Sequence, residues 1–305
     1  MSARLLHTGQ VVVDLVMALD NLPRSGGDVL ARSAQFETGG GFNVMAAAAR
    51  NGMPVVYLGR HGKGQFGDLA RYAMAVEGIE VSTPASTEQD TGLSVALIEP
   101  SAERSFISYV GAEGGLSAQD LALVDVRDED YVYVSGYSLL HDGKVQCLLD
   151  WLDSLAAAVT VVFDPGPLVN SPDAPAVARL LPRVNLWTSN CEEALRFTQV
   201  QSIGEALSTL TGLMPDNALI VVRDGPQGCW ISQHGETRHV KGFPVQAIDT
   251  NGAGDAHAGV LLAALAAGCT PEQAALRANA AAAVAVTRWG PATSPTAAEV
   301  DALIK

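Results

Sequence analysis

The sequence predicts an α/β fold, in which helices flank both faces of a mostly parallel sheet and a small β lid is attached. Strand-like and helix-like segments alternate along most of the 305 residues, a pattern typical of parallel sheets. Hydrophobic residues make up 48% of the chain and charged residues 17%, which is enough for a large core. Polar side chains fall near the predicted strand ends, where such sheets bind ligands; these are Asp14, Asn190, Asp224 and Asp249.

The predicted strands of the large sheet are short and rich in valine, as buried strands are. They cover residues 5–16, 55–62, 130–138, 159–166, 186–190 and 217–225, followed by a hairpin-like stretch over 227–245. The predicted helices lie between and after them, at residues 43–51, 67–78, 144–158, 177–184, 191–198, 254–267 and 271–287. This order of elements indicates a single domain over residues 1–305.

Two segments do not fit the alternation and indicate a separate lid. Residues 16–38 contain Pro23, Gly26 and Gly27, followed by partial apolar alternation that suggests short strands with one exposed face. Residues 94–110 contain "SVALIEP" and "SFISYVG", which read as an antiparallel pair. Together these segments are expected to form a small β lid.

Charge and cysteine content exclude several classes of partner. The formal net charge is −14, and so acidic a surface repels nucleic acid and anionic membranes. No segment is long and apolar enough to span a bilayer, and the N-terminus lacks the features of a signal peptide. The four cysteines form no CxxC pair and no zinc-type spacing, so reduced thiols in a cytoplasmic protein are expected.

The segment "DTNGAGDAHAGVLLAAL" places Asp255 after Gly252, Ala253 and Gly254 at the predicted start of a helix. Successive N–H groups in such a glycine turn can bind a phosphate, because the first helical amides have no partner and the helix dipole is positive there. Asp255 is then within reach of an incoming hydroxyl and can act as a general base in phosphoryl transfer. A plain helix cap, or a dinucleotide-binding turn, is the alternative; the third glycine of the dinucleotide fingerprint is missing.

A second glycine run, Gly39, Gly40 and Gly41, precedes Asn43 at the start of another predicted helix. Glycines allow the backbone to approach a ligand closely, and Asn43 can both donate and accept hydrogen bonds there. Asp14 lies in an otherwise apolar strand, where a charge is costly to bury and is expected to have a function. A carboxylate and an amide beside glycine-rich backbone suit the paired hydroxyls of a sugar.

Two weaker motifs follow later strands. Asn190 and Glu193 share one face of a first helical turn, where they can hold waters around Mg²⁺ or simply cap the helix. Gly225 and Gly228 follow another strand, where they can lie against a nucleotide or form a plain hairpin turn.

Taken together, these residues resemble the ribokinase-like, PfkB-type carbohydrate kinase family. The resemblance covers nearly the whole chain and depends on two segments, "GGGFNVMAAAARNGMPVVYLGRHGKGQFGDLAR" and "DTNGAGDAHAGVLLAAL". It implies ATP-dependent phosphoryl transfer to a hydroxymethyl group of a sugar, with a nucleoside as the alternative acceptor, and a homodimer formed through the lid. Rivals from other classes are a nucleotide-binding regulator without catalysis, which an intact Asp255 disfavours, and an NAD-dependent oxidoreductase.

The resemblance also implies a role for each motif residue. Asp255 is the base, and Gly252, Ala253 and Gly254 form the anion hole. Sugar hydroxyls are held by Asp14, Gly39, Gly40, Gly41 and Asn43. ATP and Mg²⁺ are bound with the help of Asn190, Glu193, Gly225, Gly228 and Asn279. Arg223 has no firm match in the family pattern and is expected to contact a phosphate of the nucleotide. A monovalent cation, usually K⁺, is bound at Asp249, Gly290 and Ser294. Asn251 occupies a position that varies in the motif, where no loss of catalysis is expected. His257 stands where the family usually has a large apolar residue and is expected to pack against a helix. Arg104, in the predicted lid, is expected to be a solvated arginine, with contact to a substrate phosphate as the alternative.

Overall fold

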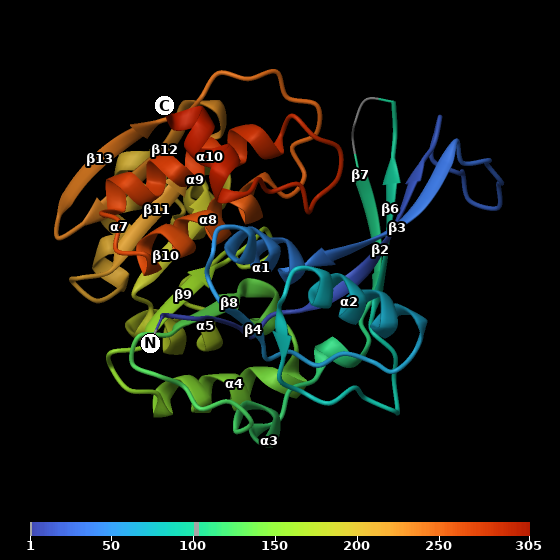
Figure 1. The fold of residues 1–305 in the computed structure, drawn as a ribbon, viewed down its shortest axis with the longest axis horizontal. Coiled ribbons are helices and arrows are strands. Elements are labelled where there is room, and N and C mark those ends of the chain that lie inside the picture. Colours follow the sequence, from blue (N-terminus) through green and yellow to red (C-terminus); the bar gives the residue numbers. More distant parts are fainter. Residues whose placement is uncertain (1, 101–103) are drawn as a thin grey trace.

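The computed structural model describes residues 2–100 and 104–305. Within these residues a nine-stranded sheet runs through the centre of the molecule (Figure 1). Its order is β13 (Glu236–Lys241), β12 (Gly228–Gln233), β11 (Leu219–Arg223), β10 (Leu186–Asn190), β9 (Thr160–Asp164), β8 (Tyr131–Ser135), β1 (Leu5–His7), β4 (Val55–Tyr57) and β5 (Glu80–Val81). The strands from β11 to β5 are parallel, and β12 and β13 are antiparallel, so the predicted mostly parallel sheet is confirmed.

Helices cover both faces of this sheet, because alternate strand residues point to opposite sides. Leu6 and Val56 belong to one core, and their neighbours Leu5 and Val55 belong to the other. The first core is covered by α3 (Ala118–Leu121), α4 (Asp142–Ser154), α5 (Pro175–Leu180), α6 (Cys191–Thr198) and α7 (Ile203–Leu213). The second is covered by α1 (Gly41–Arg50), α2 (Gln65–Val76), α8 (Ala253–Ala266) and α9 (Pro271–Ala285).

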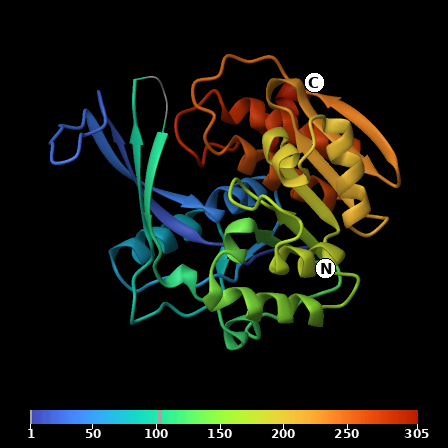
Figure 2. The ribbon, with the colours of Figure 1, turned by 180° about the vertical axis from the view of Figure 1, so that it is seen from behind.

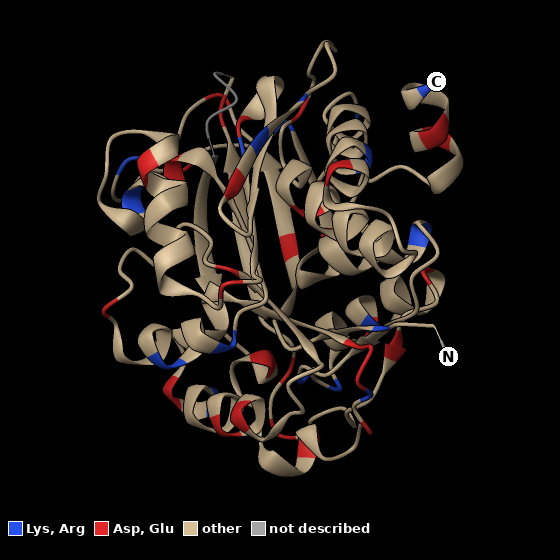
Figure 3. Cartoon of the chain, turned by 90° about the vertical axis from the view of Figure 1, so that its left-hand side faces the viewer, with Lys and Arg blue, Asp and Glu red and all other residues tan. Residues whose placement is uncertain are grey.

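The remaining helical elements are short or peripheral. Helix α10 (Ala297–Ile304) packs on α9 at the C-terminus. Single 3₁₀ turns occur at η1 (Ala112–Gly114), η2 (Gly136–Leu139), η3 (Leu181–Arg183) and η4 (Gly225–Gln227). Charged residues lie mainly on the outer helices and loops and are sparse along the central strands (Figure 3). In the described part of the chain, none of the helices has the length and apolar character needed to cross a membrane.

A second, four-stranded sheet, called the small sheet below, projects from one side of this body (Figures 1 and 2). Its order is β3 (Ser33–Gly40), β2 (Val11–Ala18), β6 (Leu93–Ile98) and β7 (Arg104–Tyr109). The expected antiparallel pair over residues 94–110 corresponds to β6 and β7. The sheet also includes most of the first predicted strand, which the sequence assigned to the body.

The predicted strand over residues 5–16 is in fact two strands in two different sheets. β1 ends at His7, and β2 begins at Val11. Between them the chain turns closely over the His7 ring, whose Nδ1 accepts a hydrogen bond from the Gly9 N–H at 3.1 Å. A Cβ on Gly9 would lie 2.4 Å from the ring, so the turn requires glycine there. One continuous segment therefore joins the body to the small sheet.

Helices α7 and α10 were not anticipated, although their sequences carry start signals. Ser202 accepts a hydrogen bond from the Glu205 N–H, and Thr296 forms a capping box with Glu299. A serine or threonine with glutamate three residues later is the pattern expected at a helix start.

Candidate active site

Helix α8 begins with a turn that only glycine can form. Gly252 is its N-cap, with φ at +73°, and a Cβ there would lie 1.8 Å from the carbonyl oxygen of Pro291. Ala253 and Gly254 follow in the first turn, so their N–H groups have no partner within the helix. This turn is the predicted anion hole, and the local geometry can bind an anion.

Asp255 lies in the same first turn and is held by a residue from far away in the sequence. Asn43, near the start of α1, donates a hydrogen bond from Nδ2 to Asp255 Oδ2 at 3.0 Å. The two helices pack closely because Gly259 has no side chain: a Cβ there would lie 2.4 Å from the Val44 carbonyl oxygen. The structure thus brings together one predicted sugar-binding residue and the predicted base.

Burial raises the pKa of Asp255 to about 6, and nearby Asp164 and Glu193 add to this effect. The hydrogen bond from Asn43 and the positive charge of Arg223 act in the opposite direction and lower the pKa. A carboxylate with a pKa near 6 is ionised at neutral pH and is a stronger base than an ordinary aspartate. These properties are the ones that a general base needs.

Arg223, at the end of β11, lies directly beneath this turn and contacts several acidic side chains. Its Nη1 donates to Thr188 Oγ1 at 2.7 Å, and Asp164 and Glu193 lie 3.4 and 3.6 Å from its guanidinium. A Cβ on Gly254 would lie 3.4 Å from Arg223 Nη2, so the guanidinium is next to the anion hole. Asp164 was not among the predicted site residues, although its place at the end of a predicted buried strand, in "VVFDPG", is a signal that indicates a ligand-binding position.

Asn190 and Glu193 form a capping box at the start of α6. Each side chain accepts a hydrogen bond of 2.8 Å from the other residue's backbone N–H. Helix capping, one of the two interpretations of this motif, is therefore confirmed. Burial and the charge of Asp164 raise the pKa of Glu193, while Arg223 lowers it. The Glu193 carboxylate also faces the Arg223 cluster, which leaves its role toward Mg²⁺ a prediction.

Asp14 lies in β2 and faces two other polar residues of the small sheet. Glu37 is opposite it in β3, and Ser94 is opposite it in β6. A Cβ on Gly39 would lie 2.1 Å from Asp14 Oδ2, so the carboxylate rests directly on this glycine. Burial and the neighbouring charge of Glu37 raise the pKa of Asp14 to about 6, against a hydrogen bond from Ser94 that lowers it.

The other glycines of the run have separate structural reasons. A Cβ on Gly41 would lie 2.1 Å from the buried His7 ring, and a Cβ on Gly40 would lie 2.7 Å from the Gln10 carbonyl oxygen. The run therefore allows α1 to begin directly against the segment that joins the two sheets. This places Asn43 and Asp14 on adjoining segments.

Asn279 and His257 are buried and bonded to each other. His257 Nε2 lies 3.1 Å from Asn279 Oδ1, and Asn279 Nδ2 donates to the carbonyls of Val240 and Lys241 at 3.0 and 3.2 Å. Asn279 thus ties α9 to β13 and α8, and its contact with a nucleotide stays a prediction. His257 is packed inside the body, and burial lowers its pKa to about 3.

The predicted nucleotide glycines lie in the turn between β11 and β12. Gly225 begins the 3₁₀ turn, and Gly228, with φ at +105°, begins the next strand. They form a hairpin, as one of the two interpretations expected. Their contact with a nucleotide also stays a prediction.

Two of the three predicted cation-binding residues are in direct contact. Buried Asp249 accepts hydrogen bonds from the N–H groups of Asn251 and Gly290, at 2.9 and 3.2 Å. Ser294 follows four residues after Gly290, and its Oγ is buried without a hydrogen-bond partner among the described residues. Over residues 2–100 and 104–305, no group of three or more His, Cys, Asp or Glu side chains has the arrangement of a metal site. The side chain of Arg104 lies outside the described part of the structure.

The raised pKa of Asp255 predicts a specific dependence of stability on pH. Because the folded-state pKa of about 6 exceeds the ordinary value of 3.8, ionisation costs free energy only in the folded protein. The contribution of the Asp255 carboxyl to the free energy of unfolding is therefore fully present below about pH 4, where the group is protonated in both states. This contribution is lost as the pH rises through about 6, where the folded-state carboxyl ionises. At pH 8, Asp255→Asn should therefore raise the free energy of unfolding by about 1 to 3 kcal/mol.

Denaturant unfolding at pH 4 and pH 8 measures this difference, with exposed Asp216→Asn as the matched control. The control should behave like the unchanged protein at both pH values. Equal stability of Asp255→Asn and the unchanged protein at pH 8 would contradict the raised pKa.

Comparisons with known proteins agree with this geometry. Residues 2–298 match the model of the pfkB family of carbohydrate kinases. An Escherichia coli K12 protein described as "Uncharacterized sugar kinase YegV" is 32% identical over 96% of this chain and 91% of its own length. The ribokinase of Haemophilus influenzae is 28% identical over 95% of each chain.

Solved structures share the fold. The Arabidopsis thaliana ribokinase, in complex with ribose and ATP, superposes with a TM-score of 0.82 and 22% identity over 100% of this chain and 99% of its own. The fold class predicted from the sequence is thereby confirmed. Given the family match over nearly its whole length, this chain belongs to the pfkB family of carbohydrate kinases and is an ATP-dependent sugar kinase.

Proposed function

We propose that this kinase transfers the γ-phosphoryl group of ATP to the hydroxymethyl group of a small, uncharged sugar, with Asp255 as the general base. The observation that carries the proposal is the first turn of α8, where Asp255 follows the Gly252–Gly254 turn and is held by Asn43. A base and an anion-binding turn are thus built on the same few residues. Phosphoryl transfer needs both within reach of one acceptor oxygen.

In this proposal each residue of the site has a separate task. Asp255 accepts the proton of the attacking hydroxyl, and the Asn43 amide keeps the carboxylate aimed at it. The N–H groups of the Gly252–Gly254 turn stabilise the charge that develops on the phosphoryl oxygens, with the Arg223 guanidinium close behind. The bond from the sugar oxygen to phosphorus forms as the bond to the ADP oxygen breaks, so ADP leaves with the electron pair.

The residues present fit a nucleotide with Mg²⁺. Asp164 and Glu193 supply two carboxylates beside Arg223, and Mg²⁺ is commonly bound through one or two carboxylates and several waters. When bound, Mg²⁺–ATP supplies the phosphoryl group and neutralises part of its charge. We assign the nucleotide to the side of the site formed by Asn190, Glu193 and the turn from Gly225 to Gly228. Use of ATP, together with the four unpaired cysteines, favours a cytoplasmic location.

The small sheet supports an uncharged acceptor. Asp14 and Glu37 are directly opposite each other, and the pKa of Asp14 is raised by burial and then by the charge of Glu37, so a further negative charge nearby is unfavourable. Glu37 also lies against the body, since a Cβ on Gly290 would be 3.6 Å from its carboxylate. Two carboxylates accept hydrogen bonds from sugar hydroxyls but repel a phosphate or carboxylate on the substrate.

A nucleoside is the second candidate acceptor, and one aromatic side chain favours it. Phe106 is exposed and lies on the same face of the small sheet as Ser94 and Asp14, by the register of β2, β6 and β7. A base could stack on this ring. A sugar remains the first candidate, because the paired carboxylates of Asp14 and Glu37 suit hydroxyl groups.

The test is ADP release from Mg²⁺–ATP across neutral sugars, their phosphorylated counterparts and nucleosides, with Asp255→Asn beside the unchanged protein. We expect turnover of at least one neutral sugar and a loss of about 100-fold or more in the variant, with ATP binding retained. Since Asp255 must be ionised, the rate should fall as the pH drops through about 6.

Other outcomes of this assay separate the alternatives. A preference for nucleosides would favour the second candidate acceptor. A preference for sugar phosphates would contradict the proposal that Glu37 repels a charged substrate, and turnover of sugar phosphates by Glu37→Gln would then measure the effect of this carboxylate. Bound ATP without turnover of any compound would favour a nucleotide-binding regulator.

We also propose that the small sheet closes over the bound sugar and joins two copies of the chain. The face opposite Asp14 is apolar and exposed, with Phe36, Ile107 and Tyr109 between about half and two-thirds accessible (48%, 66% and 67%). Sedimentation velocity should show a dimer, and replacing Ile107 by Lys should shift it toward monomer. A monomer at micromolar concentration would refute this pairing.

A monovalent cation, with K⁺ as the expected ion, is the last part of the proposal. Asp249 supplies a buried carboxylate, and Ser294 supplies a buried oxygen in need of a partner. Such a cation would lie beside the segment that touches Gly252. Turnover should be several times faster in KCl than in tetramethylammonium chloride at equal ionic strength, and equal rates would rule out the site.

A further inference from the structure

The segment 290–296, called the backing segment below, connects α9 to α10 and lies directly behind the anion hole. It has no regular secondary structure, so its backbone groups need partners other than a helix or strand. Its Pro291 carbonyl oxygen occupies the place where a side chain on Gly252 would be. The position of this segment therefore limits where the first turn of α8 can lie.

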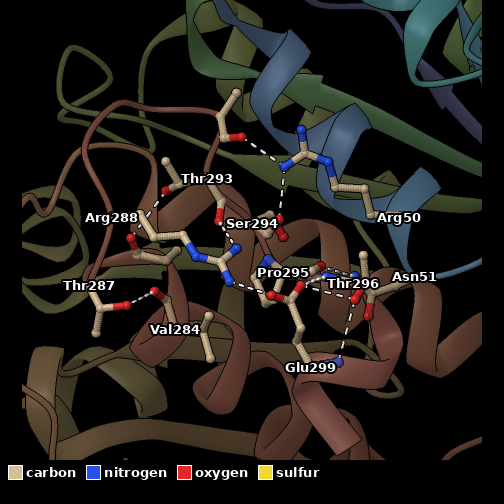
Figure 4. Close-up of polar contacts among 12 residues, drawn as sticks. Arg50, Asn51, Val284, Thr287, Arg288, Thr293, Ser294, Pro295, Thr296 and Glu299 are labelled. Atoms are coloured by element: carbon tan, nitrogen blue, oxygen red, sulfur yellow. Dashed lines mark hydrogen bonds and ion pairs between the residues drawn. The ribbon is translucent and has the colours of Figure 1, made fainter.

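Side chains hold four successive carbonyl groups of the backing segment (Figure 4). Arg50 Nη1 donates to the carbonyls of both Ala292 and Ser294, each at 2.8 Å. Arg288 Nη1 donates to Thr293 at 3.2 Å, and Asn51 Nδ2 donates to Pro295 at 3.0 Å. Arg50 thus binds the carbonyl groups on both sides of Thr293, and one of them, that of Ala292, directly follows Pro291 in the chain.

Arg50 is itself fixed in place by an ion pair. Its Nε and Nη2 donate to the two carboxylate oxygens of Glu77 at 3.0 and 2.6 Å, which leaves Nη1 directed at the carbonyls. A planar guanidinium can bind a carboxylate on one edge and carbonyls on another, which a lysine ammonium does not reproduce. The guanidinium is mostly buried, with its side chain 25% exposed.

Helix α1 links this contact to the other side of the active site. Asn43, near its start, holds Asp255, and Arg50, its last residue, holds the backing segment. The same helix therefore sets both the base and the support of the anion hole. The helix is packed closely against α8 through Gly259, so both contacts depend on the position of one helix.

We propose that Arg50 is a positioning residue for phosphoryl transfer: it holds the backing segment against Gly252 and so keeps the anion hole aligned with Asp255. The proposal rests on the function proposed above. Arg50 acts on the transition state through Gly252 and has no contact with the sugar-binding residues Asp14 and Gly39. Its loss should therefore lower kcat and leave the KM for the sugar almost unchanged.

The test compares Arg50→Ala, Arg50→Lys and the unchanged protein in the ADP-release assay. We expect kcat to fall about 10- to 100-fold in Arg50→Ala, as for a displaced oxyanion donor, with the sugar KM within about threefold. Millimolar guanidinium chloride should restore part of the rate in Arg50→Ala and should not accelerate the unchanged protein. The kcat of Arg50→Lys should lie between those of Arg50→Ala and the unchanged protein, because one ammonium cannot bind both carbonyls and Glu77.

Two control variants separate positioning from general stability. Glu77→Gln removes the charge of the ion pair but retains an amide oxygen that accepts from Arg50, so the Arg50 contacts with Ala292 and Ser294 are kept. Arg179→Ala removes the ion pairs of α5 with Asp150 and Asp153 of α4, on the other face of the large sheet. Both should lower the melting temperature with kcat within twofold of the unchanged protein. The proposal would be overturned if Arg50→Ala lost no more kcat than a control variant with the same melting temperature. It would also be overturned if guanidinium restored none of the lost rate.

The Asp255→Asn variant keeps this outcome distinct from failure of the proposed function. If Asp255→Asn is inactive while Arg50→Ala is fully active, only the positioning proposal fails. If Asp255→Asn is as active as the unchanged protein, the proposed base fails, and the guanidinium rescue still reports on Arg50.

Discussion

The close packing of α1 against α8 is the constraint on which the rest of the site depends. Gly259 and Ala47 let the two backbones approach so closely that a Cβ on Gly259 would lie 2.4 Å from the Val44 carbonyl oxygen and 2.6 Å from the Ala47 Cβ. Larger side chains would separate the helices and break the hydrogen bond from Asn43 to Asp255. The alanine-rich composition of both helices thus has a structural reason, since small residues allow α1 and α8 to lie close enough for Asn43 and Asp255 to meet.

The electrostatics of the site follow from the same compactness. Asp164, Glu193 and Asp255 gather around the single guanidinium of Arg223, and burial raises the pKa of Asp255 beyond what that one cation offsets. The site is therefore less stable than a core of neutral residues would be. The same raised pKa lets Asp255 accept a proton near neutral pH, and many enzymes combine a less stable active site with higher activity in this way.

Local sequence patterns predicted most of the helices and strands, but they could not predict contacts between residues that are far apart in the chain. The glycine turn before Asp255 and the capping pair of Asn190 and Glu193 are short-range features, so their geometry could be anticipated. The division of residues 5–16 between two sheets was not, because periodicity alone does not distinguish a buried strand from two consecutive ones. The bonds from Arg50 to Ala292 and Ser294 span more than 240 residues, and no local pattern indicates them.

The two edges of the large sheet have a consequence for how the protein behaves at high concentration. One edge strand, β5, is only two residues long, and the other, β13, has the mostly exposed, charged sequence "ETRHVK". Short or charged edges offer little for a strand of another molecule to pair with. The parallel core, rich in valine and prone to aggregate if its edge were open, is thereby shielded from β-type self-association.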